Sequence, residues 1–323
     1  MIYSNDLKRV AEEFDLYYSN FNPDNERLLK IVNQMYEIHK IDSSYILKTE
    51  LHELMCRECK VHLFKESPFF FEISSGRTRY TWGGLQSPVG SFLHNTTADK
   101  WLDPYADSLA SDMAEGLIHC WNNPVGFDHH CPGYDKVLLL GLKGIISEAE
   151  AALNCCNDKR KREFYSSVIR SNKALAGLAG RFAQKAAELA ESIETAGEKA
   201  HYNKIRTVAL NVPENPPKSF YEAMCAIIFY RECVGSIEGI GFSTFGQLDR
   251  LLNPYYEADL AAGRITEEEA LKLIHTLFIY TDIRFDVNKS FKETSTSIVI
   301  GGCDKDGNII YNTITKLILK ALL

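Results

Sequence analysis

Long stretches of helical periodicity dominate the chain and most constrain its fold. Apolar residues recur at helical spacing over residues 98–121 and 134–154, and again from Asp158 to Glu194. This last segment is rich in alanine and contains Gly177 and Gly180. A glycine inside a helix costs about 1 kcal/mol relative to alanine, so we expect a closely packed neighbour to compensate at both positions. The pattern predicts a mostly helical protein.

Further helices are indicated towards the N-terminus and in the middle of the chain. The first sixty or so residues predict helices that begin near Asn22 and Asp42, each followed by an apolar stripe. Residues 219–234 predict a mostly apolar, buried helix. Between these parts, residues 68–73 predict a buried strand or an aromatic wall, and the glycines and prolines of 76–97 predict a loop.

The last third of the chain carries clear start signals for helices and one strand. Thr266 and Glu269 have the spacing of a capping box at a helix N-terminus. Residues 295–300 alternate as in a strand and lead into a glycine-rich turn. A final helix is predicted to begin at Asn312 or Thr313.

Composition and charge exclude several classes of partner. The chain has 43 acidic and 36 basic residues, a net charge of -7, and this charge is spread along the sequence. The densest basic cluster, residues 159–162, is interpreted as a solvated helix start, so no nucleic-acid partner is expected. The strongest apolar run, residues 226–230, is too short to span a bilayer. Nine cysteines at irregular spacing indicate reduced thiols and a cytoplasmic location.

Five short motifs follow one another in the second part of the chain. They are His129-His-Cys-Pro-Gly-Tyr134, Val212-Pro-Glu-Asn-Pro-Pro-Lys-Ser-Phe-Tyr-Glu-Ala223, Thr244-Phe-Gly-Gln-Leu-Asp249, Asn253-Pro-Tyr-Tyr256, and Gly301-Gly-Cys-Asp-Lys-Asp-Gly307 followed by Asn312. In this order the motifs resemble the pyruvate formate-lyase-like glycyl radical enzymes. The resemblance covers roughly residues 125–320 and is less clear before them.

The resemblance implies an α/β fold that is predominantly helical and forms part of an incomplete, ten-stranded barrel. Residues 1–323 would then be the N-terminal portion of one pyruvate formate-lyase-like domain, with the C-terminal glycyl radical domain absent. Because the apolar stripe of the last helix runs to Leu323 without a capping glycine or a polar tail, we interpret Leu323 as a truncation point.

The resemblance also implies a reaction. The whole enzyme would be an anaerobic, cytoplasmic carbon–carbon lyase, dehydratase or decarboxylase for a small polar substrate. A radical S-adenosylmethionine activase would install its glycyl radical, and a homodimer is expected. The chain lacks both a Gly-Cys-x-Glu-like loop and an Arg-Val-x-Gly-Tyr segment, and Cys303 occupies a variable turn position. No catalytic residue, bound cofactor or metal is therefore expected in this chain, which alone should be inactive.

The residues expected to position substrate come from the same resemblance. Thr244 and Asp249 correspond to positions that face the pocket in dehydratase members, with Ser243 beside them. A hydroxyl and a carboxylate there would hold polar substrate groups and could assist proton transfer. His129 would add a group that titrates near neutral pH, and Phe70 is a weaker candidate for a substrate clamp.

Each of these residues also has a structural interpretation. Thr244 would cap a helix, Asp249 would pair with a neighbour such as Arg250 or Gln247, and His129 would be a loop histidine. Gln247 stands where the family has arginine, and Arg250 where it has glutamine, so the two donors are exchanged. Gly133 replaces the family's aspartate before the motif tyrosine. These departures leave the substrate open.

Two other classes of function remain as alternatives. The chain could be a non-catalytic helical scaffold or binding protein. It could also be a zinc or thiol protein that uses His52, Cys56 and Cys59, because His52-x3-Cys56-x2-Cys59-x2-His62 places potential ligands near one helix face. One straight helix cannot supply four converging ligands, so a zinc site would need others, such as Cys131. Buried thiols are the simpler interpretation.

Overall fold

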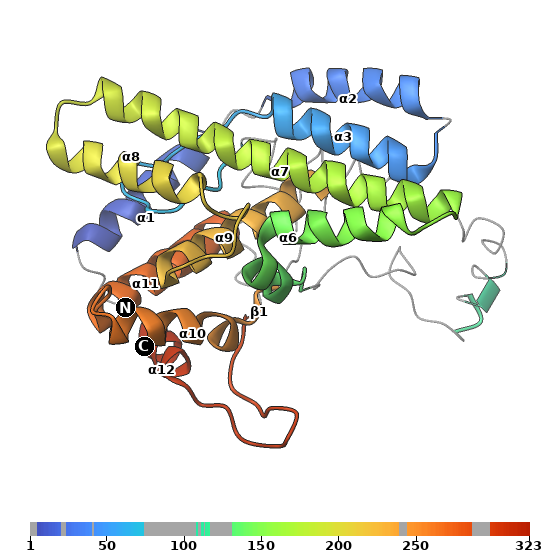
Figure 1. Cartoon of the computed structure of the whole chain (residues 1–323). Coiled ribbons are helices and arrows are strands. Elements are labelled where there is room, and N and C mark those ends of the chain that lie inside the picture. Colours follow the sequence, from blue (N-terminus) through green and yellow to red (C-terminus); the bar gives the residue numbers. More distant parts are fainter. Residues whose placement is uncertain are drawn as a thin grey trace.

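The computed structural model describes residues 5–20, 24–40, 42–73, 108, 111–112, 114–116, 131–238, 244–285 and 298–323. Within these residues the protein is mostly helical, as predicted (Figure 1). Most of the predicted helix at 98–121 and all of the predicted loop at 76–97 lie outside the described residues. None of the described helices combines the length and the apolar character needed to cross a membrane.

Long helices lying side by side form one half of the molecule (Figure 1). The longest, α7 (Lys159–Ser192), packs against α3 (Ser44–Glu58), α6 (Tyr134–Asn154) and α8 (Ala196–Ala209). Helix α2 (Asn25–His39) packs on α3 and lies at the outer edge of this layer.

A second group of helices forms the other half. Helices α9 (Phe220–Cys233) and α11 (Glu267–Phe285) lie in the middle of the molecule, and α1 (Asn5–Ser19) packs on α11. Helices α10 (Leu248–Ala261) and α12 (Thr313–Leu322) pack against each other below them. The predicted buried helix at 219–234 is confirmed, because most side chains of α9 are buried.

A short parallel sheet lies beside α10. Strand β1 (Gly246–Gln247) pairs with β2 (Ile298–Val299), with Gly246 opposite Ile298 and Gln247 opposite Val299. The described part of the predicted strand at 295–300 is thus confirmed. Helix α9 continues into a π-helix, η2 (Val234–Glu238), before the chain reaches β1.

The predicted helix starts are formed as the sequence indicates. The Ser43 side chain accepts a hydrogen bond from the N–H of Ile46 at the start of α3. The N–H of Glu269 donates to Thr266 Oγ1 at 3.2 Å, and the N–H of Thr266 donates to Glu269 Oε2 at 2.8 Å, which completes the predicted capping box. Asn312 caps α12 with a reciprocal pair of bonds to its third residue.

The aromatic segment at 68–73 is a wall of the core and not a strand. Phe69, Phe70 and Phe71 are each 0% exposed. Only Glu72 shows strand-like pairing, as an isolated bridge to His62. Three consecutive rings are buried together because the extended chain passes between α1, α9 and α11, so each face of the segment meets another layer.

Helix α6 differs from the continuous helix predicted over 134–154. Gly141 has φ 62° and ψ 174°, which interrupts the helix. The connection that precedes α9 packs into this interruption: Leu142 N–H donates to Pro213 O at 2.9 Å, and Lys143 N–H donates to Glu214 O at 3.0 Å. A Cβ atom at position 141 would lie 2.6 Å from Glu214 O. The glycine is needed for both its backbone angle and this close approach.

The glycines inside α7 do not have the close neighbours that we expected. Among the described residues, and apart from the chain neighbours and the nearby backbone of α7 itself, no atom lies within 4 Å of a Cβ built at Gly177 or Gly180. The expectation was wrong. Helix α7 packs against α3, α6 and α8, and this packing along its length offsets the cost of two glycines without a close neighbour at either position.

These two kinds of glycine predict opposite effects of an added methyl group. Gly141→Ala should lower the free energy of unfolding by about 1–3 kcal/mol or more, because the backbone conformation is restricted almost entirely to glycine and the methyl group would meet backbone. The matched substitution Gly177→Ala should raise it by about 0.5–1 kcal/mol. Urea denaturation of both variants measures the difference, and equal effects would contradict the role assigned to Gly141.

Candidate functional site

The segment from Thr244 to Asp249 carries the predicted substrate residues that the structure describes. Thr244 is half-buried and directly precedes Phe245, whose ring is 0% exposed. The chain then forms β1 and enters α10, where Asp249 is the second residue. The short pairing of β1 with β2 therefore fixes the backbone that presents Thr244.

Asp249 is buried and fully engaged by its own chain. It is 0% exposed. Its Oδ1 accepts from the N–H of Arg250 at 2.9 Å, and its Oδ2 accepts from the N–H of Gly301 and from Thr315 Oγ1, each at 2.7 Å. The side-chain amide of Asn312 donates to the Asp249 carbonyl at 3.1 Å. The carboxylate thus joins α10 to the Gly-Gly turn and to α12. The structural interpretation expected Asp249 to pair with a neighbour such as Arg250, and the structure adds Gly301 and Thr315 as partners.

Arg250 and Gln247, the two exchanged donors, lie in different environments. Arg250 Nη2 donates to the carbonyls of Gly301, at 2.7 Å, and Cys303, at 3.0 Å. Gln247 is exposed on β1. Arg250 on α10 therefore holds the glycine turn through these two hydrogen bonds. Cys303 is exposed in this turn.

The other predicted substrate residues are placed as follows. Ser243 and His129 lie outside the described residues. Phe70 is in the core, with its ring centroid 5.6 Å from that of Phe182 and 5.5 Å from that of Phe229. This position serves packing and does not favour a direct substrate contact. Of the five residues, the structure therefore brings Thr244 and Asp249 into one short segment and places Phe70 elsewhere.

A buried polar cluster lies behind Phe245, and we did not predict it from the sequence. Arg231 is 0% exposed and its guanidinium lies 4.6 Å from the centroid of the Phe245 ring. The hydroxyl of Tyr280 donates to Glu232 Oε2 at 2.8 Å, and Ser236 donates to Glu232 Oε1 at 2.8 Å. The adjacent charges of Arg231 and Glu232 at the end of an apolar helix are the signal that could have revealed it. The cluster supports the segment that carries Thr244 through a cation–π contact.

The motif that ends at Tyr134 also contacts the segment around Phe245. The ring of Tyr134 stacks on that of Phe245 with centroids 6.3 Å apart, and a Cβ atom at Gly246 would lie 2.7 Å from Cys131 Sγ. Tyr134 is 1% exposed, and burial raises the pKa of its hydroxyl well above the usual range. Within the described part of the chain, this hydroxyl has no hydrogen-bond partner. Motifs separated by about a hundred residues therefore meet around Phe245.

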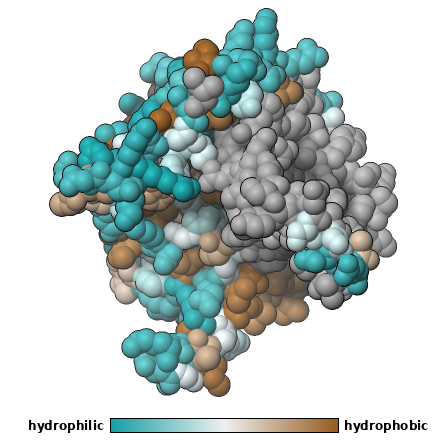
Figure 2. Space-filling model, turned by 90° about the vertical axis from the view of Figure 1, so that its right-hand side faces the viewer, coloured by the Kyte–Doolittle hydropathy of each residue, from teal (hydrophilic) through white to brown (hydrophobic). Residues whose placement is uncertain are grey.

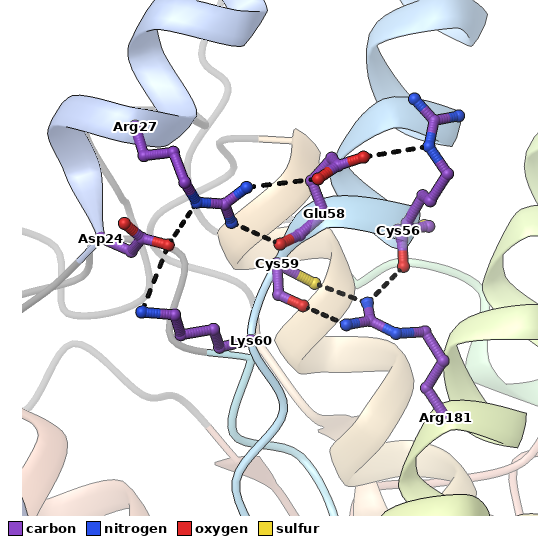
Figure 3. Close-up of polar contacts among 8 residues, drawn as sticks. Asp24, Arg27, Cys56, Glu58, Cys59, Lys60 and Arg181 are labelled. Carbon is purple, nitrogen blue, oxygen red and sulfur yellow. Dashed lines mark hydrogen bonds and ion pairs between the residues drawn. The ribbon is translucent and has the colours of Figure 1, made fainter.

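The cysteines of the proposed zinc or thiol site belong to the core. Cys56 is 4% exposed and Cys59 is 0% exposed. The guanidinium of Arg181 donates to the Cys56 carbonyl and to the carbonyl and sulfur of Cys59 (Figure 3). Burial raises the pKa of the Cys56 thiol strongly and that of Cys59 to about 11. No group of metal-binding side chains is found among the residues that the structure describes. The zinc alternative has no structural support here.

Comparison with known proteins identifies the family. Residues 88–323 match the model of the pyruvate formate lyase-like family. This range of the chain contains all five motifs. The chain therefore belongs to the pyruvate formate-lyase-like glycyl radical enzymes, as the motifs indicated.

Known relatives are much longer than this chain. An isethionate sulfite-lyase of Nitratidesulfovibrio vulgaris is 32% identical over 203 residues, which are 58% of this chain and 24% of the relative. The (2S)-3-sulfopropanediol dehydratase of Klebsiella oxytoca is 28% identical over 60% of this chain and 25% of its own length. The chain spans about a quarter of the length of these curated relatives.

The fold agrees with this assignment. The glycerol-bound B12-independent glycerol dehydratase of Clostridium butyricum superposes with a TM-score of 0.76 and 20% sequence identity, over 99% of this chain and 46% of that one. The predicted fold, a mostly helical part of the glycyl radical enzyme barrel, is confirmed.

The bonding of Asp249 predicts a large effect on stability. Asp249→Ala should lower the free energy of unfolding by about 3 kcal/mol, because buried donors of Gly301 and Thr315 lose their acceptor and each unsatisfied group costs about 1–3 kcal/mol. Asp306→Ala is the control, since the Asp306 side chain is 65% exposed. Chemical denaturation compares the two. A stable Asp249→Ala protein would show that the carboxylate is dispensable to the fold and would favour a role at a pocket.

The burial of the thiols predicts a labelling pattern. With iodoacetamide at pH 8, Cys131, Cys155 and Cys303 should react in the folded protein because they are exposed. Cys56 and Cys59 should react only after denaturation; a pKa of about 11 leaves about one thiol in a thousand ionised at that pH. Peptide mass spectrometry reads the sites. Rapid native labelling of Cys59 would contradict the burial and revive the thiol interpretation.

Proposed function

We propose that this chain is the N-terminal portion of a glycyl radical enzyme that acts on a small polar molecule as a carbon–carbon lyase, dehydratase or decarboxylase. The family match over residues 88–323 is the observation that carries the proposal. Relatives named as a lyase, a dehydratase and a decarboxylase indicate the range of reactions.

Thr244, Ser243 and His129 are proposed to contact the substrate. The support for Thr244 is its position on a short segment held from behind by Phe245, Arg231 and Tyr134. Rigid support of this kind positions a hydroxyl for binding. Asp249 is proposed to act mainly by fixing this segment to the Gly-Gly turn, because its oxygens are occupied by chain donors.

The radical steps are proposed to use residues that these 323 do not include. No Gly-Cys-x-Glu-like loop and no Arg-Val-x-Gly-Tyr segment occurs in the sequence. A radical S-adenosylmethionine activase would install the glycyl radical, which supplies hydrogen-atom abstraction when present. An anaerobic, cytoplasmic setting and a homodimer are further parts of the proposal.

Exposed apolar side chains near the sheet support this proposal. Val299 of β2 is 50% exposed, and Ile309 and Tyr311 in the loop that follows are 86% and 59% exposed. In Figure 2 this loop projects at the bottom of the molecule, and a hydrophobic patch lies above it and to its right. Parallel strands are normally covered on both faces, so this region fits a position inside a larger barrel.

The test starts from the gene. Sequencing the source DNA beyond the Leu323 codon should reveal a frame that continues into a cysteine loop and an Arg-Val-x-Gly-Tyr segment. The product of the continued frame, mixed anaerobically with S-adenosylmethionine and a reduced radical S-adenosylmethionine activase, should give the EPR signal of a glycyl radical. The 323-residue chain, treated identically, should give neither this signal nor turnover of isethionate or glycerol.

Two results would overturn the proposal. One is turnover by the 323-residue chain purified in air, which would require a different chemistry. The other is a stop codon directly after Leu323 with no separate gene for the radical half nearby, which would favour a non-catalytic scaffold.

A further inference from the structure

A small pocket lies where α3, α7 and η2 meet. Helix α3 contacts both α7 and η2, and the space between them has a volume of about 300 Å³. His52 and Cys56, two of the residues considered for the alternative zinc or thiol site, line it from α3. The other described lining residues come from three places. Helix α7 contributes Ser171, Asn172 and Leu175, the end of α9 with η2 contributes Tyr230, Cys233, Val234 and Ile237, and the segment before α6 contributes Pro132.

The π-helix builds one wall of this pocket. Val234 and Ile237 belong to η2, directly after the last residue of α9. A single π-helical turn inserted at a helix end re-aims side chains relative to a regular α-helix, and such turns are frequent at functional sites. The pocket thus depends on a local departure from helical geometry and is not a gap between regular helices.

The described lining is mostly apolar and carries a few polar groups. Among the described residues, it includes no aspartate, glutamate, lysine or arginine. Apolar surface comes from Leu175, Val234 and Ile237, and polar groups come from His52, Ser171 and Asn172. The Asn172 amide nitrogen donates to Val168 O at 2.7 Å within α7, which holds that side chain in place. A mostly apolar pocket with a few fixed polar groups is the usual form of a small-molecule site.

We propose that this pocket binds a neutral organic molecule the size of one substituted ring, with an apolar body and one hydrogen-bonding group. An apolar cavity of about 150 Å³ already accommodates benzene, so the volume here suffices for a ring with a substituent. A carboxylate, sulfonate or phosphate is disfavoured, because the described lining offers no lysine or arginine to pair with a buried anion. Neither Thr244 nor Asp249 is among the described residues that line this pocket, so the proposal is argued from the pocket's own lining.

Three matched probes test the chemistry of the pocket. Benzyl alcohol has the ring and a hydroxyl, toluene has the ring alone, and benzoate has the ring and a negative charge. Ligand-observed NMR titration of the 323-residue protein should give the tightest binding for benzyl alcohol and binding at least about tenfold weaker for benzoate. Equal binding of all three probes, or no binding of benzyl alcohol up to its solubility limit, would overturn the proposal.

A pocket-filling variant tests the location. Ser171→Leu, on the α7 side of the pocket, should weaken benzyl alcohol binding about tenfold or more. Ser192→Leu is the matched control, because Ser192 is exposed at the end of the same helix and does not line the pocket. Val234→Phe fills the space from η2 and replaces Ser171→Leu if the latter fails to fold by circular dichroism. Unchanged binding in a folded filling variant would place the ligand elsewhere and overturn the assignment.

Discussion

The close approach of two chain segments at Gly141 is the contact on which the arrangement of the helical half depends. The backbone of Pro213 and Glu214 enters the interruption of α6 and accepts hydrogen bonds from Leu142 and Lys143. A side chain at position 141 would prevent this contact. Because these bonds join α6 to the connection that leads into α9, they set where α9 begins and therefore where its buried charges lie.

Asp249 has the corresponding role in the other half. One carboxylate accepts hydrogen bonds from the start of α10, from the Gly301 turn and from the first turn of α12, and so joins α10 to a part of the chain more than fifty residues further on. A buried carboxylate is tolerated when its lone pairs are occupied by donors. The motif that identifies the family is thus explained to a large extent by architecture, and its presence in a sequence is no proof that each of its polar residues contacts substrate.

The sequence predicted what local interactions determine. The capping box at Thr266 and the cap at Asn312 depend on residues three positions apart, and both are formed. The break at Gly141 was missed because its cause, the Glu214 backbone, lies about seventy residues away and leaves no periodic signal. The support of Phe245 by Arg231 was missed although the adjacent charges at 231 and 232 were a signal, because the sequence does not show which ring the guanidinium contacts. The resemblance of the motifs supplied the fold, which periodicity alone would have left as an unspecified helical protein.

The buried cluster around Phe245 and the pocket beside His52 differ in the charged groups that they contain. Around Phe245, a buried arginine and a buried glutamate are held by aromatic and hydroxyl partners, so charge is already present and compensated. In the pocket beside His52, the described lining residues include no carboxylate, lysine or arginine. Because a buried charge is tolerated only when it is paired, an ionised ligand group would be less well accommodated in this pocket than a neutral one. The charge difference between the two environments is what the proposed neutral ligand requires.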